Sequence, residues 1–93
     1  MRKLFYTGRF KKDLKNIKKQ MGYNEHELEQ VIVKLREDLP LEEKYQDHPL
    51  HGKYEGSREC HITPDWLLVY GKDDYGLKLI LMRTGIHSKL FGS

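Results

Sequence analysis

The sequence predicts an α+β domain in which two N-terminal helices pack on one face of a small twisted antiparallel β-sheet, followed by a short C-terminal helical turn. Two observations predict this fold. Apolar residues recur at helical spacing in two successive stretches of the first 40 residues. Three strand-like segments follow in the second half, and the short turns between them make antiparallel neighbours the expected pairing. A chain of 93 residues is expected to form a single domain with one modest core.

The first half is expected to contain one short strand and both helices. Residues 2–6 alternate weakly and favour a strand, and residues 7–20 carry the first helical stripe. Asn24 and Glu27 have the spacing of a capping box that opens the second helix, and Pro40 stops it. The stripes comprise Phe10, Leu14, Ile17 and Met21 in the first helix and Leu28, Val31, Ile32, Leu35 and Leu39 in the second.

The second half is expected to supply the sheet. Residues 57–63, 66–72 and 77–84 have the composition of strands, with a Thr-Pro-Asp turn and an Asp-Asp-Tyr-Gly turn between them. Residues 40–52 have no clear periodicity and form the longest irregular segment, while residues 86–91 are long enough for one helical turn. With both helices on one face, the other face of the sheet stays available for function.

Charge is distributed unevenly along the chain. The net charge is only +3, but the first 20 residues contain eight Lys and Arg against a single acid, Asp13. Such a basic segment can hold a polyanion through phosphate contacts, and the alternative is an ordinary solvated lysine face. The single cysteine, Cys60, excludes an internal disulfide and is expected to be buried in a strand. The chain lacks a secretory signal and any apolar run of about 20 residues, so we expect a cytoplasmic protein with no membrane partner.

Histidine is the residue type that most suggests catalysis here, because its ordinary pKa of about 6.5 lets it take and give a proton near neutrality. His61 and Asp65 flank the turn between two expected strands, and Arg83 and His87 lie at and beyond the end of the last one. The meander therefore brings these four residues to one end of the sheet, where they could perform acid–base chemistry on a phosphodiester. The simpler alternatives are a structural histidine at position 61 and an ordinary turn aspartate at position 65.

Other motifs exclude several classes of function. His48 and His51 could suggest zinc, but no cysteine cluster or helical His-Glu-x-x-His motif accompanies them, so no metal is expected. No phosphate-binding Gly-x-x-x-x-Gly-Lys loop and no Gly-x-Ser-x-Gly elbow occurs, which disfavours nucleotide hydrolysis and serine hydrolase chemistry. Trp66 is either a core residue or a platform on which an RNA base stacks. His26, near the start of the second helix, is expected to be solvated.

Three ordered segments carry a family resemblance: YQDHPLHG at 45–52, RECHITPDWLLVY at 58–70 and RTGIHSKLFG at 83–92. Together with the preceding helical pair, they resemble the YafQ branch of the RelE/ParE-like bacterial toxins of type II toxin–antitoxin systems. The resemblance implies a small α+β toxin that a cognate antitoxin holds inactive. Once free, such a toxin enters the ribosomal A site and cuts the messenger RNA there, with no metal or other cofactor.

The resemblance also implies a set of site residues. By position, the catalytic set would be His48, His61, Asp65, Arg83, His87 and Phe91, with Trp66 as an adjoining RNA-binding candidate. Phe91 would stack on a base or brace the C-terminal tail. The basic first helix would contact ribosomal RNA through Lys11, Lys15 and Lys18.

The chemistry expected of this set needs no hydrolytic metal, because the 2′-hydroxyl of RNA can attack the adjacent phosphate. Asp65 would be the base or would orient His61, His87 would be the acid, and His48 is an alternative for either role. Arg83 would stabilise the extra charge of the transition state.

Two other functions remain open from the sequence. The other arm of the same superfamily poisons DNA gyrase and has no need of titratable residues around the cleft. A non-catalytic RNA-binding module would use the basic helix and leave the histidines structural, with strongly salt-dependent binding and no cleavage.

Overall fold

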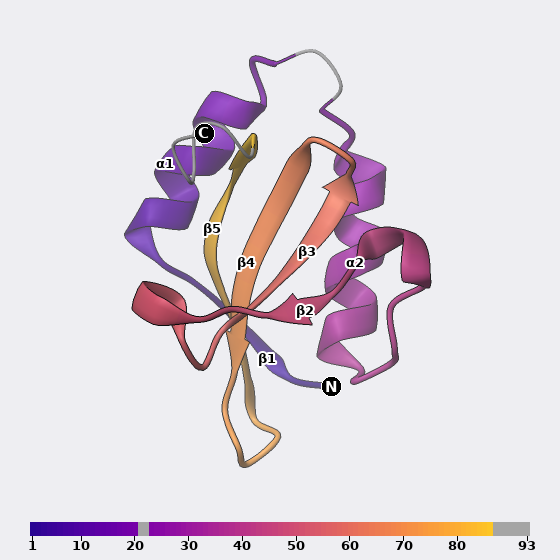
Figure 1. The fold of residues 1–93 in the computed structure, drawn as a ribbon, viewed down its shortest axis with the longest axis vertical. Helices are drawn as coiled ribbons and strands as arrows, with labels where there is room; N and C mark the ends of the chain where they lie inside the picture. Colours follow the sequence, from indigo (N-terminus) through magenta and orange to yellow (C-terminus); the bar gives the residue numbers. More distant parts are fainter. Residues whose placement is uncertain (21–22, 87–93) are drawn as a thin grey trace.

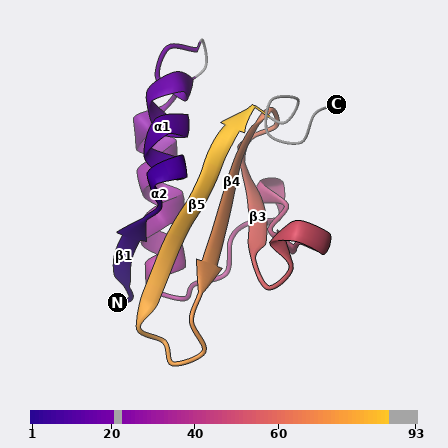
Figure 2. The same ribbon diagram turned by 90° about the vertical axis from the view of Figure 1, so that its left-hand side faces the viewer.

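The computed structural model describes residues 1–20 and 23–86, and within them it confirms the expected α+β fold. Met21 and residues 87–91 of the expected C-terminal helical turn lie outside the described residues. The helices α1 (Gly8–Ile17) and α2 (Glu25–Arg36) lie together on one side of a five-stranded sheet (Figures 1 and 2). The strands and two short 3-10 helices follow the chain as β1 (Lys3–Tyr6), Glu43–Tyr45, β2 (His48–Pro49), Gly52–Tyr54, β3 (Arg58–Thr63), β4 (Trp66–Lys72) and β5 (Lys78–Ile86).

The sheet has the strand order β1-β5-β4-β3-β2. The pairs β2·β3, β3·β4 and β4·β5 are antiparallel, as the short connections predict. β1 does not follow the antiparallel pattern. It forms the edge of the sheet beside β5 and runs parallel to β5. The sheet is therefore mostly antiparallel with one parallel edge pair, which the sequence analysis did not anticipate.

Both helices begin at the residues that the sequence indicates. The Thr7 hydroxyl accepts a hydrogen bond from Phe10 N at 3.0 Å, and the Asn24 side chain accepts one from Glu27 N at 3.2 Å. Neither helix, within residues 1–20 and 23–86, has the length and apolar character needed to cross a bilayer.

α2 ends earlier than the sequence predicts. The helix stops at Arg36, well before Pro40, because Asp38 adopts a left-handed conformation with φ 57°. Asp38 N then donates to Leu35 O, and Leu39 N donates to Lys34 O, which is the hydrogen-bond pattern of a Schellman motif. Leu39 consequently leaves the apolar stripe and is 49% exposed.

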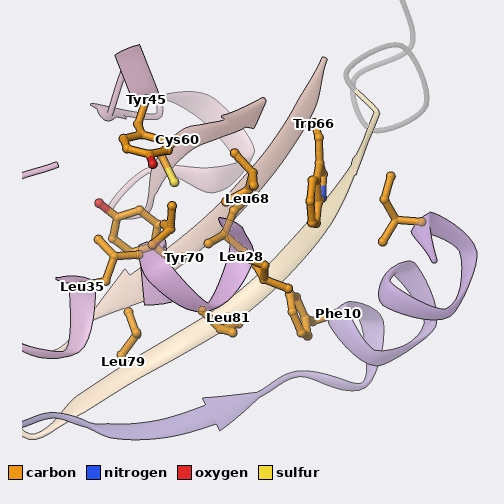
Figure 3. Close-up of a cluster of buried hydrophobic side chains, with 13 residues drawn as sticks. Phe10, Leu28, Leu35, Tyr45, Cys60, Trp66, Leu68, Tyr70, Leu79 and Leu81 are labelled. Atoms are coloured by element: carbon orange, nitrogen blue, oxygen red, sulfur yellow. The ribbon is translucent and has the colours of Figure 1, made fainter. Parts of the chain in front are cut away.

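The core fills the space between the helices and the sheet (Figure 3). Phe10 and Leu28 approach from the helices, and Leu68, Tyr70 and Leu81 approach from the strands. Cys60 is fully buried in β3, as expected, and this burial raises the pKa of its thiol above the ordinary value. The apolar residues of both stripes that remain within the helices are buried or partly buried against this cluster.

Candidate functional site

The face of the sheet opposite the helices carries the candidate site. Residues paired directly across antiparallel strands project to the same face of the sheet. His48 pairs with Glu59, Glu59 pairs with Val69, and Val69 pairs with Arg83. Because side chains alternate along a strand, His61 of β3 faces the same way as Glu59. Two of the expected histidines and the expected arginine therefore share one face.

β2 is the element that brings His48 to this face. It is only two residues long and lies within the segment that the sequence analysis left irregular. Asp47, the residue before it, accepts hydrogen bonds from the Tyr70 hydroxyl at 2.6 Å and from Arg58 Nε at 3.2 Å. These bonds tie the segment to β3 and β4 and so hold His48 against Glu59.

The two histidines have equivalent hydrogen-bond arrangements. His48 Nδ1 lies 2.6 Å from Gln46 O, and His61 Nδ1 lies 3.3 Å from Pro64 O. A carbonyl oxygen only accepts, so each Nδ1 carries a proton and donates it. Each ring is thereby oriented with Nε2 towards Glu59, and Nε2 is the atom left to exchange a proton.

Glu59 links the two rings and was not among the residues predicted for the site. Its Oε1 lies 3.4 Å from His48 Nε2 and 3.7 Å from His61 Nε2, and its side chain is only 7% exposed. The ring centroids are 6.3 Å apart. Glu59 therefore lies between the two rings and within ion-pair distance of both. The alternation of Glu59 and His61 with the buried Cys60 and Ile62 was the sequence signal for this arrangement.

A β-bulge brings Arg83 to the site. Val69 pairs with Arg83, but the next residue, Tyr70, pairs with Leu81, so Met82 is an extra residue in β5. Without this extra residue, the alternation would put Arg83 on the helix side together with Leu81. Arg83 is two strands from Glu59, which is about 10 Å at the usual strand spacing of about 4.8 Å.

Arg83 is held by α1. Its Nε donates to Asp13 Oδ2 at 2.7 Å, its Nη2 donates to Asp13 Oδ1 at 3.2 Å, and its Nη1 lies 3.4 Å from the Tyr54 hydroxyl. Hydrogen bonding to the Asp13 carboxylate raises the pKa of the guanidinium above its ordinary value, so Arg83 stays charged. In the sequence Asp13 is visible only as a single acid among basic residues, and its contact with a residue 70 positions away is not.

The remaining residues of the expected set stand apart from the two histidines. Asp65 is exposed in the β3–β4 turn and lines a cleft of about 240 Å³ on the helix side, with Tyr23 and Trp66 among the other walls. Within residues 1–20 and 23–86 it forms no hydrogen bond or ion pair, so the expected orientation of His61 comes from Pro64 O and Glu59 instead. His87 and Phe91 lie outside the described residues.

Trp66 is a core residue, which corrects the expected base-stacking role. It is 3% exposed, its ring lies 5.3 Å from that of Tyr23, and its Nε1 donates to Thr84 Oγ1 at 2.7 Å. Thr84 is also buried and donates in turn to Leu67 O at 2.7 Å. The indole therefore has no open face on which a nucleobase could stack.

Replacing Trp66 with phenylalanine should lower stability without affecting RNA binding. The change removes the hydrogen bond to Thr84 and part of a packed ring, and we expect a loss of about 1–3 kcal/mol in the free energy of unfolding. Urea denaturation measures this loss, and Tyr75→Phe at an 85% exposed position serves as the control. Unchanged stability together with weaker RNA binding would restore the stacking role.

The basic residues of α1 face solvent. Lys11, Lys15 and Lys18 are all exposed and lie at positions i, i+4 and i+7 along the α1 segment. The described residues contain no group of three or more His, Cys, Asp or Glu arranged to hold a metal ion. The site is therefore best described as two histidines around a buried carboxylate, an arginine two strands away, and a lysine-rich helix that contacts the arginine.

Known proteins are similar to this chain in both sequence and fold. The mRNA interferase toxin YafQ of Escherichia coli K12 is 36% identical over 91 residues, covering 98% of this chain and 97% of that one. The crystal structure of the E. coli DinJ–YafQ complex contains a chain that matches with a TM-score of 0.85 and 38% identity, covering 99% of this chain and all of that one. A metal-bound toxin from Helicobacter pylori matches with a TM-score of 0.88 and 42% identity, covering 98% of this chain and all of that one.

The family model gives the same result across the chain. The family described as the bacterial toxin of a type II toxin–antitoxin system, YafQ, matches residues 2–92. The match includes both helices, all five strands and the three segments that carried the resemblance. The chain therefore belongs to the YafQ family of type II toxin–antitoxin toxins.

Proposed function

We propose that this protein is a cytoplasmic toxin that cleaves messenger RNA in the ribosomal A site and is neutralised by a cognate antitoxin. The observation that carries the proposal is the pair of oriented histidines around the buried Glu59, with Arg83 on the same face. The relatives support it, because E. coli YafQ is an mRNA interferase toxin and has been crystallised in complex with DinJ.

The proposed reaction uses the RNA's own 2′-hydroxyl. A base removes the 2′ proton, the 2′ oxygen bonds to phosphorus, and the bond from phosphorus to the 5′ oxygen breaks. An acid then protonates the departing 5′ oxygen, leaving a 2′,3′-cyclic phosphate and a 5′-hydroxyl. His48 is the better candidate for contact with the RNA, because its side chain is 45% exposed whereas that of His61 is 18% exposed.

Charge stabilisation completes the proposed mechanism. The phosphorane formed during attack carries more negative charge than the substrate, and the guanidinium of Arg83 would stabilise it. Asp65, His87 and Phe91 remain in the proposed set on the strength of the family resemblance alone. A reaction of this type needs no metal, so a chelator selective for transition metals over magnesium should leave cleavage unchanged.

The direct test is cleavage of a translated message in a purified translation system, with naked RNA as the control. We expect cuts at particular codons only when ribosomes are present, with cyclic-phosphate 3′ ends and 5′-hydroxyl ends. A single 2′-deoxynucleotide before the cut should block cleavage at that site. Products with 5′-phosphates would contradict the proposed chemistry. An intact message in every lane would contradict the proposed nuclease activity. Gyrase inhibition, and RNA binding without cleavage, would then be measured.

Reversing the charge of three lysines, two in α1 and one at its C-cap, should strongly weaken ribosome association. Replacing Lys11, Lys15 and Lys18 together with glutamate changes the charge of this exposed surface by six units. The change turns attraction for phosphate into repulsion. We expect sedimentation with ribosomes to fall by at least about 10-fold near physiological salt, and wild-type binding to weaken steadily as salt rises.

The matched control changes the same amount of charge elsewhere. It reverses three exposed lysines away from α1, namely Lys3, Lys44 and Lys78. Equal losses in both triple variants would mean that total charge matters and that α1 is not the ribosome-facing surface.

A further inference from the structure

The pair between Asp13 and Arg83 is the strongest feature that the proposed mechanism does not yet use. Asp13 is the only acid among the first 20 residues, and it lies in a helix that is otherwise lysine-rich. The side chains are largely buried, with 13% of Asp13 and 16% of Arg83 exposed. α1 lies beside β5 in both views of the fold (Figures 1 and 2), so this contact joins the basic helix to the strand that carries Arg83.

The contact fixes the guanidinium rather than merely neutralising it. Both carboxylate oxygens are engaged, Oδ2 by Arg83 Nε at 2.7 Å and Oδ1 by Nη2 at 3.2 Å, which is the two-point geometry of a strong Arg–carboxylate pair. Oδ2 also accepts from Thr84 N at 3.2 Å, so the carboxylate is itself anchored to the backbone of β5. Asp13 thereby restricts rotation of a long side chain that would otherwise lose entropy when it binds a phosphate.

The pairing leaves a usable edge of the guanidinium. Asp13 occupies Nε and one hydrogen of Nη2. Among residues 1–20 and 23–86, the only other contact of the terminal nitrogens is the 3.4 Å contact of Nη1 with the Tyr54 hydroxyl, which leaves the second hydrogen of Nη2 and at least one of Nη1. Nη1 and Nη2 together form the edge that binds two oxygens of a phosphate. A cleft of about 190 Å³ borders the pair and is lined by Asp13, Asn16, Arg83 and Gly85 among others.

We propose that Asp13 is a positioning residue that holds Arg83 in the orientation needed to bind the scissile phosphate of the RNA. The role rests on the proposed nuclease function, and Asp13 itself does not touch the RNA. It also gives the basic helix a second use, because a helix docked on ribosomal RNA would hold Arg83 in place through Asp13.

The test is a double-mutant cycle measured as single-turnover cleavage on programmed ribosomes at saturating toxin. Asp13→Asn keeps a side chain of the same shape that can still accept from Thr84 N, but it removes the charge that pairs with Arg83. We expect cleavage to fall by about 10- to 100-fold with ribosome binding unchanged. In an Arg83→Ala background the same change should have no further effect, because there is no guanidinium left to position. Asp74→Asn removes an equal charge from an exposed turn and should be silent.

Several outcomes distinguish this role from a structural one. If Asp13→Asn costs the same factor with and without Arg83, Asp13 serves only to anchor α1, and the proposal is overturned. Full activity in Asp13→Asn beside an inactive Arg83→Ala would also overturn it while leaving the nuclease function intact. If wild type itself leaves the message uncut, the proposed function fails and this role fails with it. Asp13→Glu, which keeps the charge but displaces it by one methylene, should retain part of the activity, and circular dichroism checks that each variant is folded.

Discussion

Replacing His48 with alanine should lower mRNA cleavage on the ribosome by about 10²- to 10⁴-fold, the range typical of a lost general acid or base. The reason is geometric. Hydrogen bonding of Nδ1 to Gln46 O leaves Nε2 as the reactive atom, and Glu59 Oε1 lies 3.4 Å from it. Single-turnover cleavage of a defined message, with the products separated on a gel, measures the loss.

His51 supplies the matched control for this variant. It is an exposed histidine three residues further along the same segment, and nothing in the proposed mechanism involves it. His51→Ala should therefore cleave at the wild-type rate. Since His48 is half-exposed, His48→Ala should unfold within about 1 kcal/mol of wild type, and imidazole added to the buffer should restore part of its activity. Wild-type cleavage by a folded His48→Ala protein would remove His48 from the reaction.

Replacing Phe10 with alanine should produce the largest loss of stability, about 3–5 kcal/mol in the free energy of unfolding. Phe10 is 1% exposed, and it is the first of the two buried side chains through which α1 packs on the core. Its ring stacks on that of Tyr6 with centroids 5.6 Å apart. A domain of this size has only about 5–15 kcal/mol of stability in total, so much of the margin would be lost.

Thermal denaturation followed by circular dichroism measures this effect, and Phe5 is the matched control. Phe5 is 36% exposed, and two lysine ammonium groups lie over its ring at 5.3 and 5.7 Å. Phe5→Ala should cost no more than about 1 kcal/mol. Because Phe10 also holds the helix that carries Asp13, Phe10→Ala should lose cleavage even at temperatures where it stays folded. An equal effect of both substitutions would mean that α1 does not depend on Phe10 for its docking.

Local patterns in the sequence were sufficient to predict most elements of this fold. The periodic apolar residues that begin at Phe10 and at Leu28 predicted both helices, because a helical stripe repeats within a few residues and can be recognised without knowing what it packs against. Thr7 and Asn24 cap their helices through their own side chains, so the helix starts were also visible locally. The end of α2 could not be predicted locally, because the left-handed residue that ends it is Asp38, and glycine is the residue that usually marks such an end.

Local sequence patterns could not predict which distant segments pair with each other. A strand of only two residues, β2, has too few positions to show a period, so its pairing with β3 and the position of His48 beside Glu59 emerged only in the folded chain. The bulge at Met82 is a property of two strands together, and it alone turns Arg83 to the face of the histidines. The contact of Arg83 with Asp13 joins residues 70 positions apart.

The sequence by itself therefore determined the α+β class, the helix starts, the three long strands and, through its motifs, the family and the residue types of the site. Only the tertiary structure decided which of those residues meet, because a register, a bulge or an ion pair depends on where two separate segments lie relative to each other. That is why His48, His61 and Arg83 share a face with the unforeseen Glu59, while Trp66 lies in the core.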